Sequence, residues 1–375
     1  MKICFVVNKL SFFLSHRLDL AAEIAKTHQL VLVTDLTNSS KKEKIMLEKN
    51  NIQAIQIFQR SKEKGWKDWF RYLYDLSTIL RKASPQYVFY VTLELSMLGA
   101  LLHNFLGGKK SFFLITGLSH HLTSNSFKML IRRALQRIFN LLLYLRKDHL
   151  FIFQNNDDCF LFVKKKMAYK NKTKVIYGNG VNEDVFKFIN RETEKQVVFL
   201  FAARLLISKG IQEFIQASEI LKKKYPEIIF RIAGSFNPSD PESIARELFN
   251  TLPSAVDYIG DVHYLEMHEI LSDASVFVLP SYGEGLPKAA LEAGLTGLPL
   301  VLTNVSGCRD CIDEKNKNGF LVRVGSVKDL AEKMELLITS KELRLQQGMH
   351  SKNFIAECYG NKAIQKEYLK LLTKQ

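Results

Sequence analysis

Short runs of β-branched, aromatic and other apolar residues alternate along the chain with longer stretches in which apolar residues recur at helical spacing. The short runs predict strands, and stretches such as 16–27, 69–82, 210–225 and 327–339 predict helices. Alternation of this kind is typical of parallel, doubly wound α/β sheets. The strands are expected at 3–8, 29–34, 52–58, 86–92, 111–116, 149–154, 174–177, 196–202, 228–233, 256–260, 275–280, 298–303 and 319–322.

A polar run, "FINRETEKQ" at 188–196, is the best candidate for a linker between two domains. The chain has 375 residues, of which 47% are hydrophobic, and this fits two domains of roughly 150 to 200 residues. We expect an N-terminal Rossmann-like domain at 1–188, a second at 189–355, and a C-terminal helix at 356–375 that packs back towards the first. Two such sheets leave a cleft at the carboxyl ends of their strands, where ligands of these folds bind.

Cysteine use and hydropathy exclude several classes of protein. Five cysteines in a chain this long do not predict a secreted disulfide scaffold, and they favour a reducing cytoplasm. Cys308 and Cys311 form a CxxC, but no second pair or histidines follow at zinc-ligand spacing, so no metal site is expected. The N-terminal apolar run is too short for a signal peptide, and no window of 18 residues is free of charge, so no membrane span is expected.

The net charge of +15 is concentrated in the first half of the chain. Residues 1–200 hold 32 Lys and Arg against 16 Asp and Glu, whereas residues 201–375 hold 21 against 22. The segment 126–147 has helical-period apolar residues and a basic face, which suits either an anionic membrane surface or a domain-packing helix with a solvated face. Nucleic acid is not expected, because no aromatic-interleaved or helix-turn-helix pattern is present. The basic residues are Arg132, Arg133, Arg137, Arg146 and Lys147.

The stretch "SYGEGLPKAALEAG" at 281–294 follows a predicted strand with a tight loop and then a helix. Pro287 is expected as the first helical residue. Such a helix end offers backbone N–H groups and a positive dipole, which suit a diphosphate. Glu284 before the helix and Glu292 within it could accept hydrogen bonds from a hexose and a ribose. Alternatively, Glu292 is a solvated helix residue and Glu284 a charge favoured by the helix dipole.

A second motif, "FAARLLISKG", places Arg204 just after a predicted strand and Lys209 five residues later. Two cations at the carboxyl end of a strand can neutralise a leaving diphosphate without a metal ion. Taken alone, the two residues are more typical of ordinary loop charges.

Together, these motifs resemble the retaining GT-B glycosyltransferases of glycosyltransferase family 4. The family's Arg and Lys pair appears as "RLLISKG" and its Glu-x7-Glu motif as "EGLPKAALE". Weaker matches at 8–21, 114–119 and 175–186 extend the resemblance to nearly the whole chain. The sequence is most similar to bacterial transferases that extend polyprenyl-diphosphate-linked oligosaccharides, including N-acetylgalactosamine, O-antigen and capsule transferases.

The resemblance implies a role for individual residues. Arg204 and Lys209 correspond to the diphosphate contacts, and Glu292 to the residue that holds the ribose. Glu284, with the backbone amides of Gly285 and Leu286, corresponds to the group that binds the transferred sugar. The other implied positions are Gly234 and Val262 in the nucleobase pocket, and His16 near the acceptor.

Two features differ from the family or cannot be assigned. The loop after the first strand lacks the glycines that many members carry, which puts in doubt any contact of this domain with the diphosphate. A local helix role for His16 stays open, and His120 or His121 could serve the acceptor side instead.

The resemblance implies an enzyme that moves a hexose or N-acetylhexosamine from a nucleotide sugar, expected to be a UDP-sugar, with retention and with no cofactor. The acceptor is expected to be a polyprenyl-diphosphate-linked sugar at an anionic membrane surface. The enzyme would be cytoplasmic and peripherally bound to the inner face of the membrane. The alternatives are a sugar-nucleotide epimerase of the same architecture and a catalytically silent partner subunit.

Overall fold

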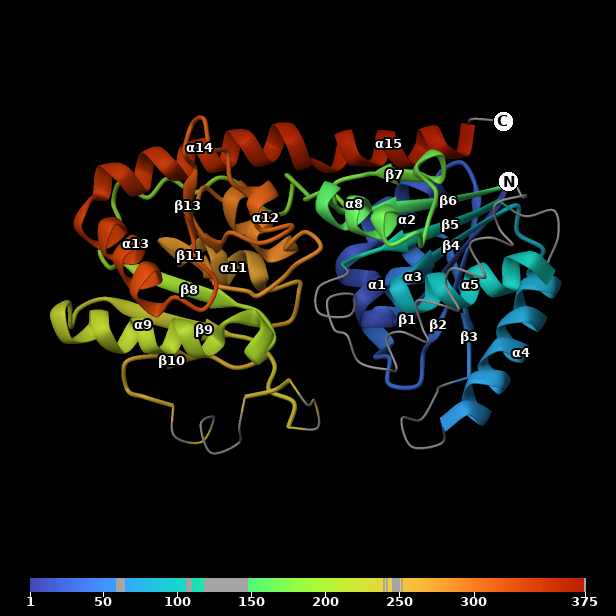
Figure 1. Cartoon of the computed structure of the whole chain (residues 1–375), viewed down its shortest axis with the longest axis horizontal. Coiled ribbons are helices and arrows are strands. Elements are labelled where there is room, and N and C mark those ends of the chain that lie inside the picture. Colours follow the sequence, from blue (N-terminus) through green and yellow to red (C-terminus); the bar gives the residue numbers. More distant parts are fainter. Residues whose placement is uncertain are drawn as a thin grey trace. The chain divides into compact units, whose positions relative to one another are not determined.

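The computed structural model describes residues 1–58, 65–105, 110–117, 148–238, 240, 242–244, 250 and 252–373. The chain divides into two compact units, of which the first contains Met1–Asn179 and Ile364–Gln375 and the second contains Gly180–Ala363. Each unit is built on a parallel sheet connected by helices (Figure 1). The predicted α/β class with two Rossmann-like sheets is confirmed.

Within the described residues, the first unit has a seven-stranded sheet in the order β3-β2-β1-β4-β5-β6-β7, with every neighbouring pair parallel. The inner strands β1, β2, β4, β5 and β6 are mainly apolar and buried because both faces of the sheet are covered, whereas the edge strands β3 and β7 carry polar residues. The strands are β1 (Lys2–Lys9), β2 (Gln29–Asp35), β3 (Ile52–Gln56), β4 (Tyr87–Val91), β5 (Lys110–Ile115), β6 (His149–Phe153) and β7 (Thr173–Val175).

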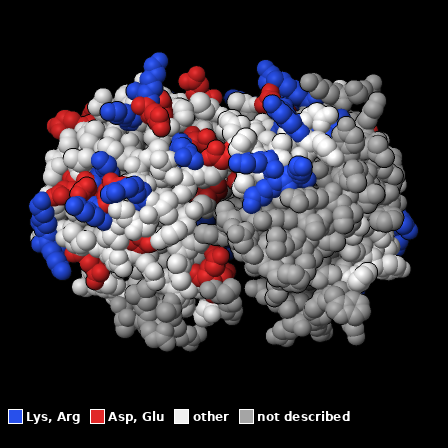
Figure 2. Space-filling view, in the orientation of Figure 1, with Lys and Arg blue, Asp and Glu red and all other residues white. Residues whose placement is uncertain are grey.

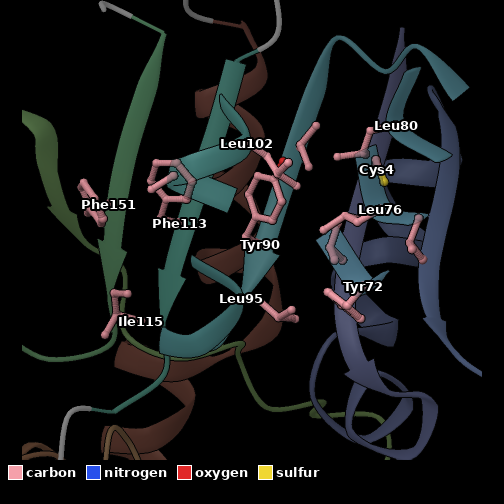
Figure 3. Close-up of a cluster of buried hydrophobic side chains, with 14 of the residues drawn as sticks. Cys4, Tyr72, Leu76, Leu80, Tyr90, Leu95, Leu102, Phe113, Ile115 and Phe151 are labelled. Carbon is pink, nitrogen blue, oxygen red and sulfur yellow. The ribbon is translucent and has the colours of Figure 1, made fainter. Parts of the chain in front are cut away.

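The helices of the first unit follow its strands and cover its sheet. Figure 3 shows Tyr72, Leu76 and Leu80 of one helix, α4, in the same buried cluster as Cys4 and Tyr90 of the sheet. Each of these five side chains is at most 3% exposed, so α4 closes the core on its face of the sheet. The helices are α1 (Leu10–His16), α2 (Leu18–Ala25), α3 (Lys41–Lys49), α4 (Gly65–Ala83), α5 (Leu93–Phe105), α8 (Asn156–Lys164) and α15 (Asn361–Thr373).

The C-terminal helix α15 packs within the first unit. Its Tyr368 hydroxyl accepts a hydrogen bond from Arg17 Nη1 at 3.1 Å, and both side chains are buried. Glu367 of the same helix forms an ion pair with Lys174, with Nζ and Oε2 2.7 Å apart. The last twelve residues of the chain therefore complete the unit that the first residues begin.

The second unit has, in its described part, a six-stranded sheet in the order β10-β9-β8-β11-β12-β13, again parallel throughout. The order reverses between β8 and β11, so the loops that follow these two strands lie at the switch point where such sheets bind ligands. The strands are β8 (Val198–Ala202), β9 (Ile229–Ala233), β10 (Asp257–Tyr258), β11 (Val276–Leu279), β12 (Leu300–Thr303) and β13 (Gly319–Val322).

Small residues let one helix of the second unit, α12, pack closely beneath another, α14. Gly294 of α12 faces Ile355 of α14, and a Cβ on Gly294 would lie 2.8 Å from Ile355 Cγ1. The run "AALEAGL" therefore suits a helix that is buried on nearly every side. The helices are α9 (Ile211–Lys224), α11 (Met267–Ser272), α12 (Lys288–Leu295), α13 (Val327–Thr339) and α14 (Lys341–Tyr359).

Two expectations fall on residues outside those that the structure describes. These are the basic face of Arg132, Arg133 and Arg137 and the histidine pair His120 and His121. Among the described residues, no helix has the length and apolarity needed to cross a membrane.

Candidate active site

The two motifs singled out in the sequence follow the two strands at the switch point of the second unit. Lys209 belongs to a short 3₁₀ helix (Ile207–Lys209) after β8, and Glu284 belongs to the loop after β11. Because β8 and β11 are parallel neighbours, their carboxyl ends lie at the same edge of the sheet. This topology brings together side chains that are 75 positions apart in the sequence.

Backbone hydrogen bonds join these two loops. The Ser208 carbonyl oxygen accepts from the Tyr282 N–H at 2.9 Å and from the Ser281 hydroxyl at 3.1 Å. Gly210 has φ of 74°, and a Cβ there would lie 2.1 Å from the Pro280 carbonyl oxygen. Only glycine fits this position, because it needs both a left-handed conformation and close approach of a backbone.

The centre of the site is an ion pair between the two motifs. Lys209 Nζ lies 2.6 Å from Glu284 Oε1, and the two side chains are 20% and 13% exposed. Both charges are thus largely withdrawn from water, and a charge that is withdrawn from water needs a partner of opposite sign. The structure therefore places two residues with expected donor-binding roles in direct contact.

A third loop, which follows β12, supports the backbone beside Glu284. The Glu284 N–H donates to the Ser306 carbonyl oxygen at 3.4 Å. Gly307 has φ of 77°, and a Cβ on it would lie 2.5 Å from the Gly285 carbonyl oxygen and 2.6 Å from that of Glu284. Gly307 begins the family-like run "GCRD", but the sequence predicted no role for it, although a glycine in the loop after this strand was a possible signal of close backbone approach.

The helix that carries Glu292 begins one residue later than expected. Pro287 is the N-cap residue, with φ of −73° and an extended ψ of 101°, and α12 starts at Lys288. This corrects the expectation that Pro287 is the first helical residue, because its ψ lies outside the helical region. Leu286, just before it, is 9% exposed and Gly285 is buried.

Glu292 has a partner that the sequence reading did not identify. Its Oε1 lies 2.8 Å from Lys288 Nζ, one helical turn earlier. Glu292 is only 8% exposed, so the alternative that it is a solvated helix residue is wrong. The Lys and Glu spacing of four residues was the available signal, since such residues are neighbours on a helix.

Arg204 is placed differently from the other candidate residues. Its side chain is 64% exposed, and Nη1 lies 3.9 Å from Asp240 Oδ2. The structure therefore does not place Arg204 in the ion pair of Lys209 and Glu284. Such an exposed and distant pair contributes little to stability, so the guanidinium can turn towards a ligand at small cost.

The two residues expected in the nucleobase pocket follow β9 and β10. Gly234 has φ of 152°, and a Cβ on it would lie 1.8 Å from the Ala203 carbonyl oxygen, directly before Arg204. The Tyr258 hydroxyl donates to the Gly234 carbonyl oxygen at 2.9 Å, and Val262 is half-buried after β10. Gly234 therefore lies beside the loop that bears Arg204.

A tyrosine in the Glu284 loop links the site to α9. The Tyr282 hydroxyl donates to Glu213 Oε1 at 2.5 Å, and Glu213 lies in the first turn of α9. This hydrogen bond raises the pKa of Tyr282 to about 12, because ionisation would place two negative charges in contact. The contact was not predicted, since nothing local in the sequence pairs these two residues.

His16 is the last residue of α1 in the first unit. Its Nδ1 lies 2.7 Å from the Ser15 hydroxyl, and its ring stacks on Phe12 with centroids 4.3 Å apart. Both contacts are with residues of the same helix. The role near the acceptor that the family resemblance implies for His16 stays a prediction.

The CxxC motif lies beneath the site rather than in it. Cys308 and Cys311 are both fully buried, and burial raises the pKa of each thiol well above its usual range. Buried protonated thiols pack as small apolar groups and react slowly. No group of three or more His, Cys, Asp or Glu with metal-binding geometry occurs among the residues that the structure describes.

Comparison with known proteins gives matches in both halves of the chain. The family described as "Glycosyl transferases group 1" matches residues 182–354, and "Glycosyl transferase 4-like" matches residues 2–151. The N,N'-diacetylbacillosaminyl-diphospho-undecaprenol alpha-1,3-N-acetylgalactosaminyltransferase of Campylobacter jejuni is 30% identical over 277 residues, 69% of each chain. The UDP-Gal:alpha-D-GlcNAc-diphosphoundecaprenol alpha-1,3-galactosyltransferase of Escherichia coli is 26% identical over 203 residues, 51% of each chain.

Solved structures show the same fold over the whole chain. HepE from Anabaena, in complex with UDP and glucose, superimposes with a TM-score of 0.77 at 16% identity, covering 100% of this chain and 99% of that one. The sucrose-phosphate synthase of Thermosynechococcus elongatus gives a TM-score of 0.80 at 15% identity, covering 99% and 98%.

Proposed function

Because the chain belongs to the group 1 glycosyltransferases, with an N-terminal half of the 4-like family, we propose that it transfers a hexose or N-acetylhexosamine from a UDP-sugar to a lipid-linked sugar. The C. jejuni and E. coli relatives are named for transfer to undecaprenol-diphosphate-linked sugars, which supports this acceptor class. The HepE structure contains UDP and glucose, which supports the donor class.

The observation that carries the proposal is the Lys209–Glu284 ion pair at the switch point of the second unit. In the proposed complex, Lys209 and Arg204 contact the diphosphate. Glu284 and the amides of Gly285 and Leu286 bind the transferred sugar. Glu292 binds the ribose.

The two lysine and glutamate pairs suit a ligand that carries both phosphates and hydroxyls. A diphosphate offers Lys209 and Lys288 more negative charge than a single carboxylate does, so both lysines can exchange Glu284 and Glu292 for phosphate oxygens. The carboxylates, now without a cation, accept hydrogen bonds from sugar hydroxyls. Donor binding then replaces two internal ion pairs with contacts of matching chemistry.

We propose that transfer occurs with retention and front-face attack, as the family resemblance implies. The bond between the anomeric carbon and the diphosphate oxygen breaks, and the acceptor hydroxyl oxygen bonds to that carbon on the same face. The acceptor proton passes to the departing phosphate oxygen. Lys209 and Arg204 stabilise the negative charge that develops on the diphosphate. Electrostatic stabilisation of this kind is usually the largest contribution to the rate enhancement.

Fixed cations in the site support a metal-independent reaction. The sequence has no Asp-x-Asp motif to hold a divalent ion against a diphosphate. Lys209, Arg204 and Lys288 supply positive charge on one edge of the sheet instead.

A lipid-linked acceptor requires the enzyme to reach a membrane. We propose peripheral association with the inner face of the cytoplasmic membrane, driven by the basic excess in residues 1–200. The segment 126–147, with Arg132, Arg133 and Arg137, is one candidate for the contact.

A panel of labelled UDP-sugars, incubated with a polyprenyl-diphosphate-linked acceptor, tests the proposal. Transfer with retained configuration supports it. Formation of an epimerised nucleotide sugar would instead indicate an epimerase, and nucleotide binding with neither transfer nor hydrolysis would indicate a silent partner subunit.

A further inference from the structure

A pocket in the second unit lies apart from the candidate active site. It contains about 330 Å³ of space, partly open to solvent, where the polar run 188–196 meets the beginning of α14. Of the described residues that line it, none is proposed to bind the donor. We call it the Arg344 pocket and define it by six of its lining residues, Phe188, Arg191, Glu194, Lys341, Arg344 and Leu345.

The pocket and the proposed donor site lie at opposite ends of α12. Lys288, whose ammonium group pairs with Glu292, is the first residue of this helix. At the other end, the carbonyl oxygen of the C-cap residue Thr296 accepts a hydrogen bond from Arg191 Nη1 at 2.8 Å. A helix of this length spans about 12 Å. An ion in the Arg344 pocket would therefore occupy a site of its own.

Positive charge exceeds negative charge around the pocket. Arg191, Lys341 and Arg344 line it, whereas Glu194 is the one carboxylate among its described lining residues. On the face of the second unit that Figure 2 shows, by contrast, acidic and basic side chains are interspersed. Arg344 is only 8% exposed, and burial lowers the pKa of Arg191 to about 10. Two guanidinium groups that are largely withdrawn from water thus share one carboxylate, although such charges need partners of opposite sign.

The hydrogen bonds of Arg344 leave one of its donors unused. Nη1 donates to the carbonyl oxygens of Leu337 at 2.6 Å and Ile338 at 3.2 Å, and Nη2 donates to Glu194 Oε2 at 3.2 Å. Nε is buried and has no hydrogen-bond partner among the residues that the structure describes. Because a buried N–H without an acceptor is unfavourable, a ligand that supplies an acceptor here would be stabilised.

Lys341 adds a third cation at the edge of the pocket. Its side chain is exposed, and Nζ donates to the Glu192 carbonyl oxygen at 2.6 Å. Lys341 is also the first residue of the 19-residue helix α14, so the positive end of the helix dipole lies beside the pocket. An anion is a stronger acceptor than a neutral carbonyl, so Lys341 can exchange Glu192 for an anionic ligand.

We propose that the Arg344 pocket binds a small anion of the phosphate class, either inorganic phosphate or a phosphomonoester. Such a group carries about 1.5 to 2 negative charges at pH 7, which matches the excess of cations over Glu194, whereas a carboxylate carries one. Its several oxygens can accept from guanidinium and ammonium groups together. The pocket exceeds the roughly 30 Å³ of one water molecule, so it has room for a polyatomic ion. The inference goes beyond the proposed function, because it concerns a second ligand and does not depend on sugar transfer.

Isothermal titration calorimetry with inorganic phosphate, at constant ionic strength and in saturating UDP, measures this binding. UDP fills the proposed diphosphate site, so phosphate has to bind elsewhere. We expect saturable binding to the wild-type protein and about tenfold weaker binding to Lys341→Gln, which loses one charge-assisted hydrogen bond. Glu194→Gln should bind phosphate roughly tenfold more tightly, because the competing carboxylate is removed. A purely structural role of these residues would not produce that gain.

A second variant tests the unused donor of the buried arginine. Arg344→Lys keeps the positive charge but removes the Nε–H and the planar guanidinium, and it should weaken phosphate binding about tenfold. Circular dichroism confirms that this variant is folded before titration. Lys341→Gln changes an exposed residue, so the inference stays testable even if Arg344→Lys does not fold.

Matched controls locate the ion and identify its class. Lys328→Gln removes a lysine that is 85% exposed near the beginning of the neighbouring helix α13, and it should bind phosphate as the wild type does. Lys209→Met, titrated without UDP, should also retain phosphate binding. A parallel titration with glycerol phosphate separates the two sources: tighter binding than phosphate identifies a phosphomonoester, and weaker binding identifies inorganic phosphate.

The outcomes separate the explanations. No phosphate binding by the wild-type protein would overturn the inference. Binding that is unchanged in Lys341→Gln but lost in Lys209→Met would place phosphate at the diphosphate site and also overturn it, as would acetate binding as tightly as phosphate. Phosphate binding that changes with the pocket variants, in a protein that neither binds UDP nor transfers sugar, would leave the inference standing and refute the proposed function.

Discussion

Replacing Lys209 with methionine is the most direct test of the site. The change removes the ammonium group and keeps an apolar side chain of similar length. In the structure, Nζ lies 2.6 Å from Glu284 Oε1, and the two side chains are 20% and 13% exposed. The substitution therefore has two effects: it removes a cation from the expected diphosphate site, and it leaves the Glu284 carboxylate largely buried without its partner.

The two effects have different magnitudes. Loss of one preorganised group that stabilises developing charge reduces kcat by about 10²- to 10³-fold, which corresponds to about 3 to 4 kcal/mol. Breaking a fully buried ion pair costs about 3–5 kcal/mol of stability, and an exposed pair contributes at most about 1 kcal/mol. The Lys209–Glu284 pair lies between these limits, so we expect Lys209→Met to lower stability by about 2 kcal/mol.

A double-mutant cycle separates the two effects. Lys209→Met, Glu284→Gln and the double variant are compared by turnover with the best UDP-sugar and by thermal unfolding. Because glutamine is neutral, the double variant leaves no buried charge without a partner, and it should regain most of the stability that Lys209→Met loses. It should regain no turnover, since the cation is still missing. Wild-type turnover in Lys209→Met, or recovery of turnover in the double variant, would show that the pair is only structural.

Three further changes have defined outcomes. Arg204→Ala should lower kcat by about 10²- to 10³-fold in a transfer assay and leave the unfolding temperature unchanged, because its side chain is 64% exposed. Activity should survive excess EDTA, and strict dependence on added Mg²⁺ or Mn²⁺ would refute the fixed-cation mechanism. The raised pKa of Tyr282, about 12, implies a stabilising hydrogen bond that is complete below pH 10 and is lost as the pH rises towards 12. Tyr282→Phe should therefore be less stable than wild type at neutral pH by chemical denaturation, with a difference that shrinks over that alkaline range.

Hydropathy predicted the sheets well. Every strand in the described part of the chain overlaps a run expected from the sequence, including the two-residue strand Asp257–Tyr258. The reason is physical: strands of a parallel sheet covered on both faces need apolar side chains at nearly every position. The helix α14 (Lys341–Tyr359) was not predicted, because its buried positions include the polar residues Arg344, Gln347 and Ser351.

The buried arginine of α14 shows why such positions escape a local reading. Arg344 Nη2 lies 3.2 Å from Glu194 Oε2, a residue 150 positions earlier in the chain. Its Nη1 donates to the carbonyl oxygen of Leu337 at 2.6 Å. A charged residue can be buried when such partners exist, but they are assembled only by the tertiary fold. Helical periodicity of apolar residues cannot detect this kind of burial.

The same limit applies to the candidate site, where position was predictable and pairing was not. Lys209 and Glu284 were expected at one edge of the sheet, since parallel strands end there. Their direct contact could not be read from the sequence, because a lysine and a glutamate can equally bind a ligand or each other. Lys288 was missed for a related reason: a Lys and Glu at helical spacing is also the mark of an ordinary surface helix. In the structure, Lys288 and Glu292 are both a helix-spaced ion pair and part of the candidate site. Glu292, which is 8% exposed, needs a cation beside it until a ligand binds, and a lysine one helical turn earlier provides that cation.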